Sequence, residues 1–165
     1  SADAQFKKLV PDRWKQQYDR AAKTPTFQIK NTAYSTATVN YNYRSACHKD
    51  AGDLVEGFGN LIVLEKNKCI GKLTNDPDAK KSHISKPLDK VYEYKGGYLG
   101  FPRYGIAVDV RQGDYLAMNV HEWHCNTEII CSCEDGEKCK NDKHYGRLSI
   151  VCYLRKGMLS CATNN

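Results

Sequence analysis

The chain has 165 residues and a mass of 18.7 kDa, which allows one domain with a hydrophobic core and excludes two domains of ordinary size. No apolar run approaches the roughly 20 residues that a membrane-spanning helix needs, and the N-terminus is charged and polar, so we expect neither secretion nor a membrane. A formal charge of +6 with a pI of about 8.8 favours polyanionic partners such as nucleic acid. Without secretion, the eight cysteines are expected to be mostly reduced thiols.

Residues 1–25 form the first predicted segment, and their pattern is helical. The apolar residues follow one helical face while lysines and arginines occupy the others; they are Phe6, Leu9, Val10, Trp14 and Tyr18. Pro11 interrupts this pattern, and because proline lacks the N–H that a helix interior needs, the sequence predicts one or two short helices. After Pro25 the composition changes to Thr, Val, Tyr and small residues, so we expect extended strands between residues 26 and 50.

Further along, apolar and alternating runs predict short strands that are separated by turn-forming residues. They cover residues 60–65, 98–101, 105–110, 115–120 and 148–154. Between them lie a basic loop at residues 67–90 and a polar, cysteine-bearing insertion at residues 131–144, both typical of surface connections. The pattern predicts a mainly β chain, an antiparallel barrel or sandwich, organised as a single domain over residues 1–165.

The string RSACHKD contains two residues suited to one metal ion. His48 and Asp50 are two apart, and residues two apart on a strand project from the same face. A third ligand would come from a neighbouring strand, where HEWHC offers His121 and His124. Two imidazoles and one carboxylate leave three positions of iron(II) open, room for a bidentate keto acid and dioxygen. An H-x-D pair alone is commonly just exposed turn or strand residues, so the prediction depends on what accompanies it.

A second pair, in GRLSIVCYLR, suits a carboxylate. Arg147 and Ser149 share one face of a predicted strand, which provides a guanidinium fork and a hydroxyl for 2-oxoglutarate. An arginine at a strand start more often makes a surface salt bridge, but its place after H-x-D and His favours the co-substrate. Strand alternation also puts Asn42 and Arg44 on the face of His48. We therefore expect Arg44 to bind the other end of the keto acid and Asn42 to contact the substrate.

Three strings together resemble one family of oxygenases. They are NYNYRSACHKDAGDLVEGFGNLIVL, GGYLGFPRYGIAVDVRQGDYLAMNVHEWHCNTEI and GRLSIVCYLR, and over about residues 36–155 they look like the TET and J-binding-protein branch of the 2-oxoglutarate dioxygenases. The resemblance implies a double-stranded β-helix, or jelly-roll, core with iron(II) and 2-oxoglutarate as cofactors. It implies His48, Asp50 and His124 as catalytic iron ligands and Arg147 as the 2-oxoglutarate arginine, and it leaves His121 outside the metal site.

The resemblance also implies a reaction, the hydroxylation of a pyrimidine C5 methyl group in DNA. We expect 5-methylcytosine to be oxidised to 5-hydroxymethylcytosine, with further oxidation steps left open and thymine as the alternative base. A minimal catalytic core of the protist, fungal or viral kind is implied, and we expect an intracellular monomer, in a nucleus or a virus-infected host cell. Protein and RNA hydroxylases use the same residue types, and a non-catalytic barrel that binds DNA or zinc is an alternative from another class.

Several side chains are candidates for contact with DNA. Basic residues of the loop and of the N-terminal segment are expected at phosphates; they are Lys72, Lys80, Lys81, Lys86, Lys90, Lys7, Lys8, Arg13 and Lys15. A base that leaves the helical stack could stack on a tyrosine, although alternating tyrosines in strands more often pack. The candidates are Tyr41, Tyr43, Tyr92 and Tyr94.

The insertion carries a candidate zinc site. Thiolates and an imidazole are good zinc ligands, and a Cys3His knuckle could be formed by Cys131, Cys133, Cys139 and His144. The C-x-C-x5-C spacing is irregular, so free thiols and a disulfide stay open as alternatives. Cys47 and Cys125 flank the expected ligands but point away from the metal by strand alternation, so we assign them to packing.

Overall fold

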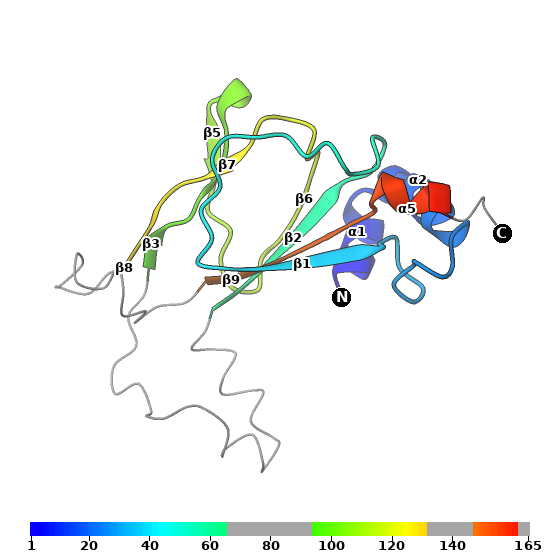
Figure 1. The fold of residues 1–165 in the computed structure, drawn as a ribbon. Coiled ribbons are helices and arrows are strands. Elements are labelled where there is room, and N and C mark those ends of the chain that lie inside the picture. The colour runs from blue at the N-terminus through cyan, green and yellow to red at the C-terminus, as the bar shows by residue number, and fades with distance from the viewer. Residues whose placement is uncertain (66–93, 132–146, 162–165) are drawn as a thin grey trace, which may run out of the picture.

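The computed structural model describes residues 1–65, 94–131 and 147–161, and its helices gather at one end of the sheet (Figure 1). Helix α1 covers Ala2–Leu9, α2 covers Pro11–Ala22, and the short α5 covers Lys156–Ser160. Pro11 is the first residue of α2, a position at which the missing N–H costs no helical hydrogen bond. The predicted helical segment is therefore two helices. None of the helices in the described ranges is long and apolar enough to cross a membrane.

The described strands are short and pair in antiparallel fashion. They are β1 (Thr36–Tyr41), β2 (Gly59–Glu65), β3 (Tyr94–Gly96), β4 (Leu99–Phe101), β5 (Ile106–Val108), β6 (Tyr115–Met118), β7 (Cys125–Asn126), β8 (Ile129–Cys131) and β9 (Arg147–Tyr153). One sheet has the order β1-β9-β2-β6 and another the order β5-β4-β7, while β3 pairs with β8. A 3-10 turn, η2 (Pro102–Tyr104), links β4 to β5. The prediction of a mainly β chain with N-terminal helices is confirmed.

Most predicted strands exist, but the segment before H-x-D differs from the prediction. Strands β2, β4, β5, β6 and β9 correspond to the predicted runs, with ends that differ by one or two residues. Between residues 26 and 50 only β1 forms, and it ends at Tyr41 because Asn42 has a φ of 47°, a conformation that a strand does not accommodate. The basic loop at 67–90 and residues 132–144 of the insertion lie outside the described residues.

The hydrophobic core is built by inward-facing residues of both sheets. Leu61 and Val63 of β2 pack with Leu99 of β4, Met118 of β6 and the following Val120, and each is at most 9% exposed. Burying a side chain of this size stabilises the fold by about 1.5–3 kcal/mol. This core holds the four-stranded sheet against β4, and Leu61, Leu99 and Met118 also form an apolar wall of the cavity described below.

One buried amide ties α2 to the rest of the chain. Gln17 is fully buried; its Nε2 donates to the carbonyl of Ala33 at 2.8 Å, and its Oε1 accepts from the backbone N–H of Phe58 at 2.8 Å.

Replacing Gln17 by leucine should destabilise the fold. Gln17→Leu keeps the volume but leaves one buried and one partly buried backbone group without partners, which should lower the free energy of unfolding by about 2–4 kcal/mol. Urea unfolding measures this loss. The exposed neighbour Gln16 supplies the control, since Gln16→Leu should leave the midpoint unchanged, and equal midpoints for both variants would contradict the assignment.

Candidate metal centre and co-substrate cavity

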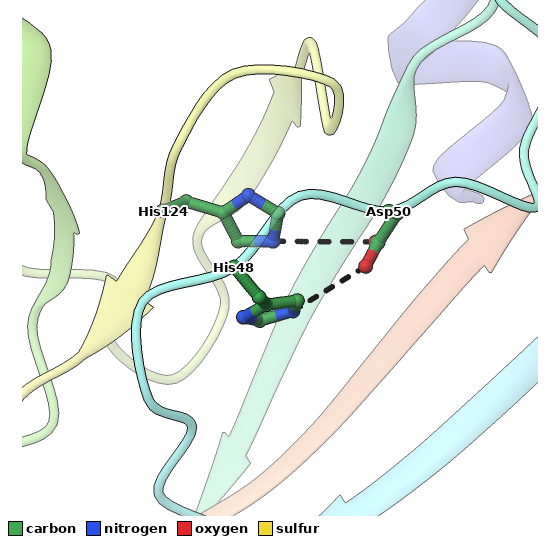
Figure 2. A group of neighbouring side chains, drawn as sticks. All are labelled: His48, Asp50 and His124. Atoms are coloured by element: carbon green, nitrogen blue, oxygen red, sulfur yellow. Dashed lines mark ion pairs between the residues drawn. The ribbon is translucent and has the colours of Figure 1, made fainter.

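Three side chains from two distant segments converge on one point (Figure 2). The ligand atoms of His48, Asp50 and His124 all lie within 4.8 Å of one another. The Nε2 atom of His48 is 3.3 Å from Oδ1 of Asp50, and the Nε2 atom of His124 is 4.0 Å from Oδ2 of the same carboxylate. His124 is buried, whereas His48 and Asp50 are partly open to solvent. This metal cluster has the composition and spacing of a facial triad of two histidines and one carboxylate.

Backbone carbonyls fix the orientation of both imidazoles. The Nδ1 atom of His48 is 2.8 Å from the carbonyl oxygen of Ala46, and the Nδ1 atom of His124 is 2.8 Å from that of Glu122. A carbonyl oxygen only accepts, so Nδ1 carries the proton in each ring. The lone pair of each Nε2 then faces the carboxylate of Asp50, as a metal ligand requires.

The two histidines are held together by the main chain. His48 donates its N–H to the carbonyl of His124 at 2.9 Å, and His124 donates to His48 at 3.0 Å, which makes an isolated antiparallel bridge. The N–H of Asp50 donates to the carbonyl of Val120 at 2.9 Å. The sequence placed His48 and Asp50 on a strand, and that detail is wrong: the pair is positioned by this bridge outside the named strands.

The structure separates the two candidate histidines of HEWHC. His121 has its N–H bonded to Oδ1 of Asn119 at 3.1 Å and its Nε2 at 3.3 Å from the carbonyl of Leu54. Its ring is thus turned to a backbone oxygen, and His121 neither joins the metal cluster nor lines the adjoining cavity. His124 is the histidine that completes the group.

A carboxyl group close to the cluster adds to its negative potential. Asp53 is 8% exposed, and burial, followed by the charge of Asp50, raises the pKa of its carboxyl to about 6. His121 and Arg155 act in the opposite direction. Two carboxylates that disfavour each other's ionisation favour a cation nearby, which agrees with a metal at the cluster. No sequence motif singled out Asp53.

The metal cluster borders a cavity of about 250 Å³ whose lining also includes the buried guanidinium of Arg147. Arg147 is 3% exposed, and burial lowers its pKa; the nearby charge of Arg111 acts in the same direction, whereas Tyr94 and Asp109 act in the opposite direction. The Nε and Nη2 atoms of Arg147 find no hydrogen-bond partner among the described residues. These two nitrogens form one edge of the guanidinium, the edge that binds a carboxylate through two parallel hydrogen bonds. The residues present therefore fit the distal carboxylate of 2-oxoglutarate.

Two neighbours adapt the cavity to this arginine. Ser149 follows Arg147 on the same face of β9, is 6% exposed and lines the cavity, as the sequence predicted. Gly97, in the turn between β3 and β4, has a φ of 71°, and a Cβ there would lie 3.3 Å from Cδ of Arg147. A larger residue at position 97 would be strained and would crowd the guanidinium.

Arg44 and Asn42 do not lie where strand alternation put them. Arg44 is exposed, and neither residue lines the cavity. The reason is the end of β1: alternation cannot be extended beyond Tyr41 when Asn42 adopts a positive φ. Asn42 instead accepts the N–H of Arg147 with its Oδ1 at 2.7 Å and donates its own N–H to the carbonyl of Arg147 at 2.9 Å. It positions the backbone of the arginine, and the second cation near Arg147 is Arg111.

The cavity contains polar residues that sequence reasoning missed. Thr38 and Asn40 of β1, Ser45, Asn126 of β7 and Tyr153 of β9 all line it. Alternation along β9 from Arg147 would have found Tyr153, and the two-residue step from His124 would have found Asn126. Nothing in the sequence pointed to Ser45, because its place depends on the chain path after β1.

The remaining candidates are placed only in part. Of the proposed zinc ligands, Cys131 ends β8, and Cys133, Cys139 and His144 lie outside the described residues, as do the loop lysines and Tyr92. The N-terminal cations lie on the helices, where Lys7 stacks over Trp14 and Lys15 pairs with Asp19. These contacts are those of ordinary helix surfaces.

Comparison with known proteins identifies the family. A sequence profile of the family Tet_JBP, described as the oxygenase domain of the 2OGFeDO superfamily, matches residues 2–156. The Leishmania infantum protein "Bifunctional helicase and thymine dioxygenase JBP2" is 30% identical over 141 residues, which are 86% of this chain and 10% of that protein. "Thymine dioxygenase JBP1" of Trypanosoma brucei brucei is 30% identical over 153 residues, 93% of this chain and 14% of that protein. The chain thus spans only about a tenth to a seventh of these relatives.

A solved structure shares the fold. NgTET1, described in complex with 5mC DNA, superposes with a TM-score of 0.58 and 14% identity, over 96% of this chain and 48% of that chain. At this identity the likeness concerns the fold, and it agrees with the predicted jelly-roll core preceded by helices. The profile match decides the assignment, and the chain therefore belongs to the Tet_JBP family, the oxygenase domain of the 2OGFeDO superfamily.

Proposed function

We propose that this chain is the oxygenase part of an iron(II)- and 2-oxoglutarate-dependent dioxygenase that oxidises the C5 methyl group of a pyrimidine in DNA. The observation that carries the proposal is one cavity that contains both the metal cluster and the unpaired guanidinium edge of Arg147. A site of this kind binds a keto acid by its two ends. A zinc site closed by four protein ligands has no open position for a keto acid, and it would leave the guanidinium of Arg147 without a carboxylate to bind.

Different residues of the cavity would bind the metal ion and the keto acid. His48, Asp50 and His124 would hold iron(II) through two Nε2 atoms and a carboxylate oxygen, and Arg147 with Ser149 would bind the distal carboxylate of 2-oxoglutarate. Bound iron(II) and 2-oxoglutarate supply the oxidising chemistry, in which dioxygen is consumed as the keto acid becomes succinate and carbon dioxide. His124 and Arg147 are 4% and 3% exposed, so the cavity walls at these residues are shielded from water and favour charged interactions inside.

The base is the finer part of the proposal, and we put thymine first. Two relatives at 30% identity are named as thymine dioxygenases. The sequence alone led us to expect 5-methylcytosine, which carries the same C5 methyl group, and no finding confirms that preference. For either base the methyl group must reach the cavity, which requires the nucleotide to leave the helical stack at a cost of a few kcal/mol.

The test compares both bases in one assay. The iron(II)-loaded chain is incubated with 2-oxoglutarate, ascorbate and DNA that contains either unmodified thymine or 5-methylcytosine, and the digested nucleosides are analysed by mass spectrometry. Hydroxymethyluracil from thymine is the expected product, and hydroxymethylcytosine would keep the reaction but change the base. If 2-oxoglutarate is consumed and neither base is oxidised, the DNA substrate is wrong and a protein or RNA substrate takes its place.

Among the described candidate tyrosines, Tyr43 is the one that we propose as the stacking residue. It lines the cavity and is 56% exposed, whereas Tyr94 is buried. Stacking of a base on an aromatic ring contributes about 1–3 kcal/mol, so Tyr43→Ala should raise the KM for DNA by about 5- to 100-fold. Tyr41 is also exposed but lies outside the cavity lining, and Tyr41→Ala is the matched control. Equal KM values for the two variants would remove Tyr43 from the binding surface.

A further inference from the structure

Asn126 is placed by its strand on the cavity side of the metal cluster. It follows His124 by two residues and ends β7, and successive residues of an extended chain alternate between faces. Its side chain accordingly lines the same cavity as His124 and Arg147. This amide is not among the side chains proposed above to hold iron(II) or the distal carboxylate of 2-oxoglutarate.

The amide is held from behind by Ser45. The Ser45 hydroxyl donates to Oδ1 of Asn126 at 2.9 Å, and the N–H of Asn126 donates to the carbonyl of Ser45 at 3.2 Å. Ser45 is 7% exposed, so this contact is shielded from competing water. With Oδ1 engaged, the Nδ2 group presents its two N–H donors, and no described residue accepts from them. A donor fixed in this way is prepared for an acceptor in the cavity.

Asn126 shares its cavity with the residues expected at both ends of the co-substrate. The metal cluster lies two residues before it, at His124. In the pairing of β7 with β4, Asn126 lies opposite Leu99. Gly97, two residues before Leu99, lies close to the side chain of Arg147. His124, Asn126 and Arg147 line one cavity, so a keto acid that binds there at the cluster and at Arg147 shares that cavity with the Asn126 amide. A neutral donor suits this position, since it binds a carboxylate without adding to the buried charge of the arginine.

We propose that Asn126, held by Ser45, is a positioning residue that donates a hydrogen bond from Nδ2 to a carboxylate oxygen of 2-oxoglutarate. The inference rests on the proposed function, because it requires the keto acid to bind between the metal cluster and Arg147. Ser45 acts indirectly: its hydrogen bond to Oδ1 keeps the Nδ2 group of Asn126 facing the cavity.

The test measures binding without turnover. Iron(II)-loaded protein is titrated with 2-oxoglutarate under anaerobic conditions by calorimetry. Asn126→Ala should raise the Kd by about 10- to 100-fold, as expected for a lost hydrogen bond to a charged group. Asn126→Asp keeps an oxygen for Ser45 and hence the local fold, but it replaces the donor by a negative charge and should weaken binding further. Ser45→Ala should show a smaller loss.

Asn119 provides a matched control for the Asn126 variants. Asn119 bonds the N–H of His121 and lies outside the cavity, so Asn119→Ala should bind 2-oxoglutarate as the wild type does. If Asn126→Asp, folded and iron-loaded, binds within twofold of the wild type, the inference is overturned. A change that appears only in the KM for DNA would also overturn it, because Asn126 would then contact the base. If the wild-type protein itself fails to bind 2-oxoglutarate, the proposed function is contradicted instead.

Discussion

Replacing His124 by alanine should abolish 2-oxoglutarate turnover, with a fall of at least about 100-fold. Loss of residues that merely orient metal ligands costs about 10- to 100-fold in metal affinity or activity, and His124 is itself placed as a ligand, with its Nε2 4.0 Å from Asp50. The ring is 4% exposed, so water cannot readily replace it in the same geometry. Succinate release and the iron content of the purified protein measure the effect.

His121→Ala is the matched control for this variant. His121 lies three residues before His124, but its Nε2 faces the carbonyl of Leu54 and not the carboxylate of Asp50. The variant should bind iron and release succinate at rates within a few-fold of the wild type. The reverse outcome, with His121 essential and His124 dispensable, would overturn the metal cluster described here. Thermal melts of both variants separate loss of the metal from loss of the fold.

Replacing Arg147 by lysine should raise the Kd for 2-oxoglutarate by about 10- to 100-fold while iron binding is kept. The Nε and Nη2 atoms of Arg147 are buried without partners among the described residues, and an ammonium cannot offer two parallel donors to one carboxylate. Each hydrogen bond to a charged group contributes about 1.5–3 kcal/mol, so the loss of one gives the stated range. Calorimetric titration of the iron-loaded variant measures it.

A matched arginine is available nearby. Arg111 is paired with Asp109 at 2.5 Å and stacks on Tyr94, and it does not line the cavity. Arg111→Lys should therefore change the affinity for 2-oxoglutarate much less than Arg147→Lys. An unchanged affinity in Arg147→Lys would mean that the co-substrate carboxylate binds elsewhere.

The sequence predicted the members of the site better than the way they are held. The pattern of residue types selected His48, Asp50 and Arg147 but left both His121 and His124 open, and the family resemblance pointed to His124, the histidine that lies beside His48 and Asp50 in the structure. The assumption that H-x-D lies on a strand failed, since the bridge between His48 and His124 depends on a pairing of distant segments that local patterns do not encode. Asp50 is likewise held by the carbonyl of Val120, 70 positions along the chain.

The same limit explains the misplaced cavity residues. Alternation holds along β9, where Arg147 and Ser149 share a face, because that strand is paired on both sides with β1 and β2. It fails after Tyr41, where a single positive φ at Asn42 redirects the chain and turns Arg44 outward. Asn residues adopt this conformation more readily than most, but the sequence alone does not say which of them does so.

The most direct test of the central claim follows the oxygen atom. The iron-loaded chain is supplied with 2-oxoglutarate, thymine-containing DNA and ¹⁸O-labelled dioxygen, and succinate and the digested nucleosides are analysed by mass spectrometry, with His124→Ala as the inactive reference. A dioxygenase of this class places one atom of dioxygen in succinate and the other in the product. We predict labelled hydroxymethyluracil together with labelled succinate. Labelled succinate with no labelled nucleoside from thymine or 5-methylcytosine DNA would contradict the assignment of a pyrimidine methyl group as the substrate.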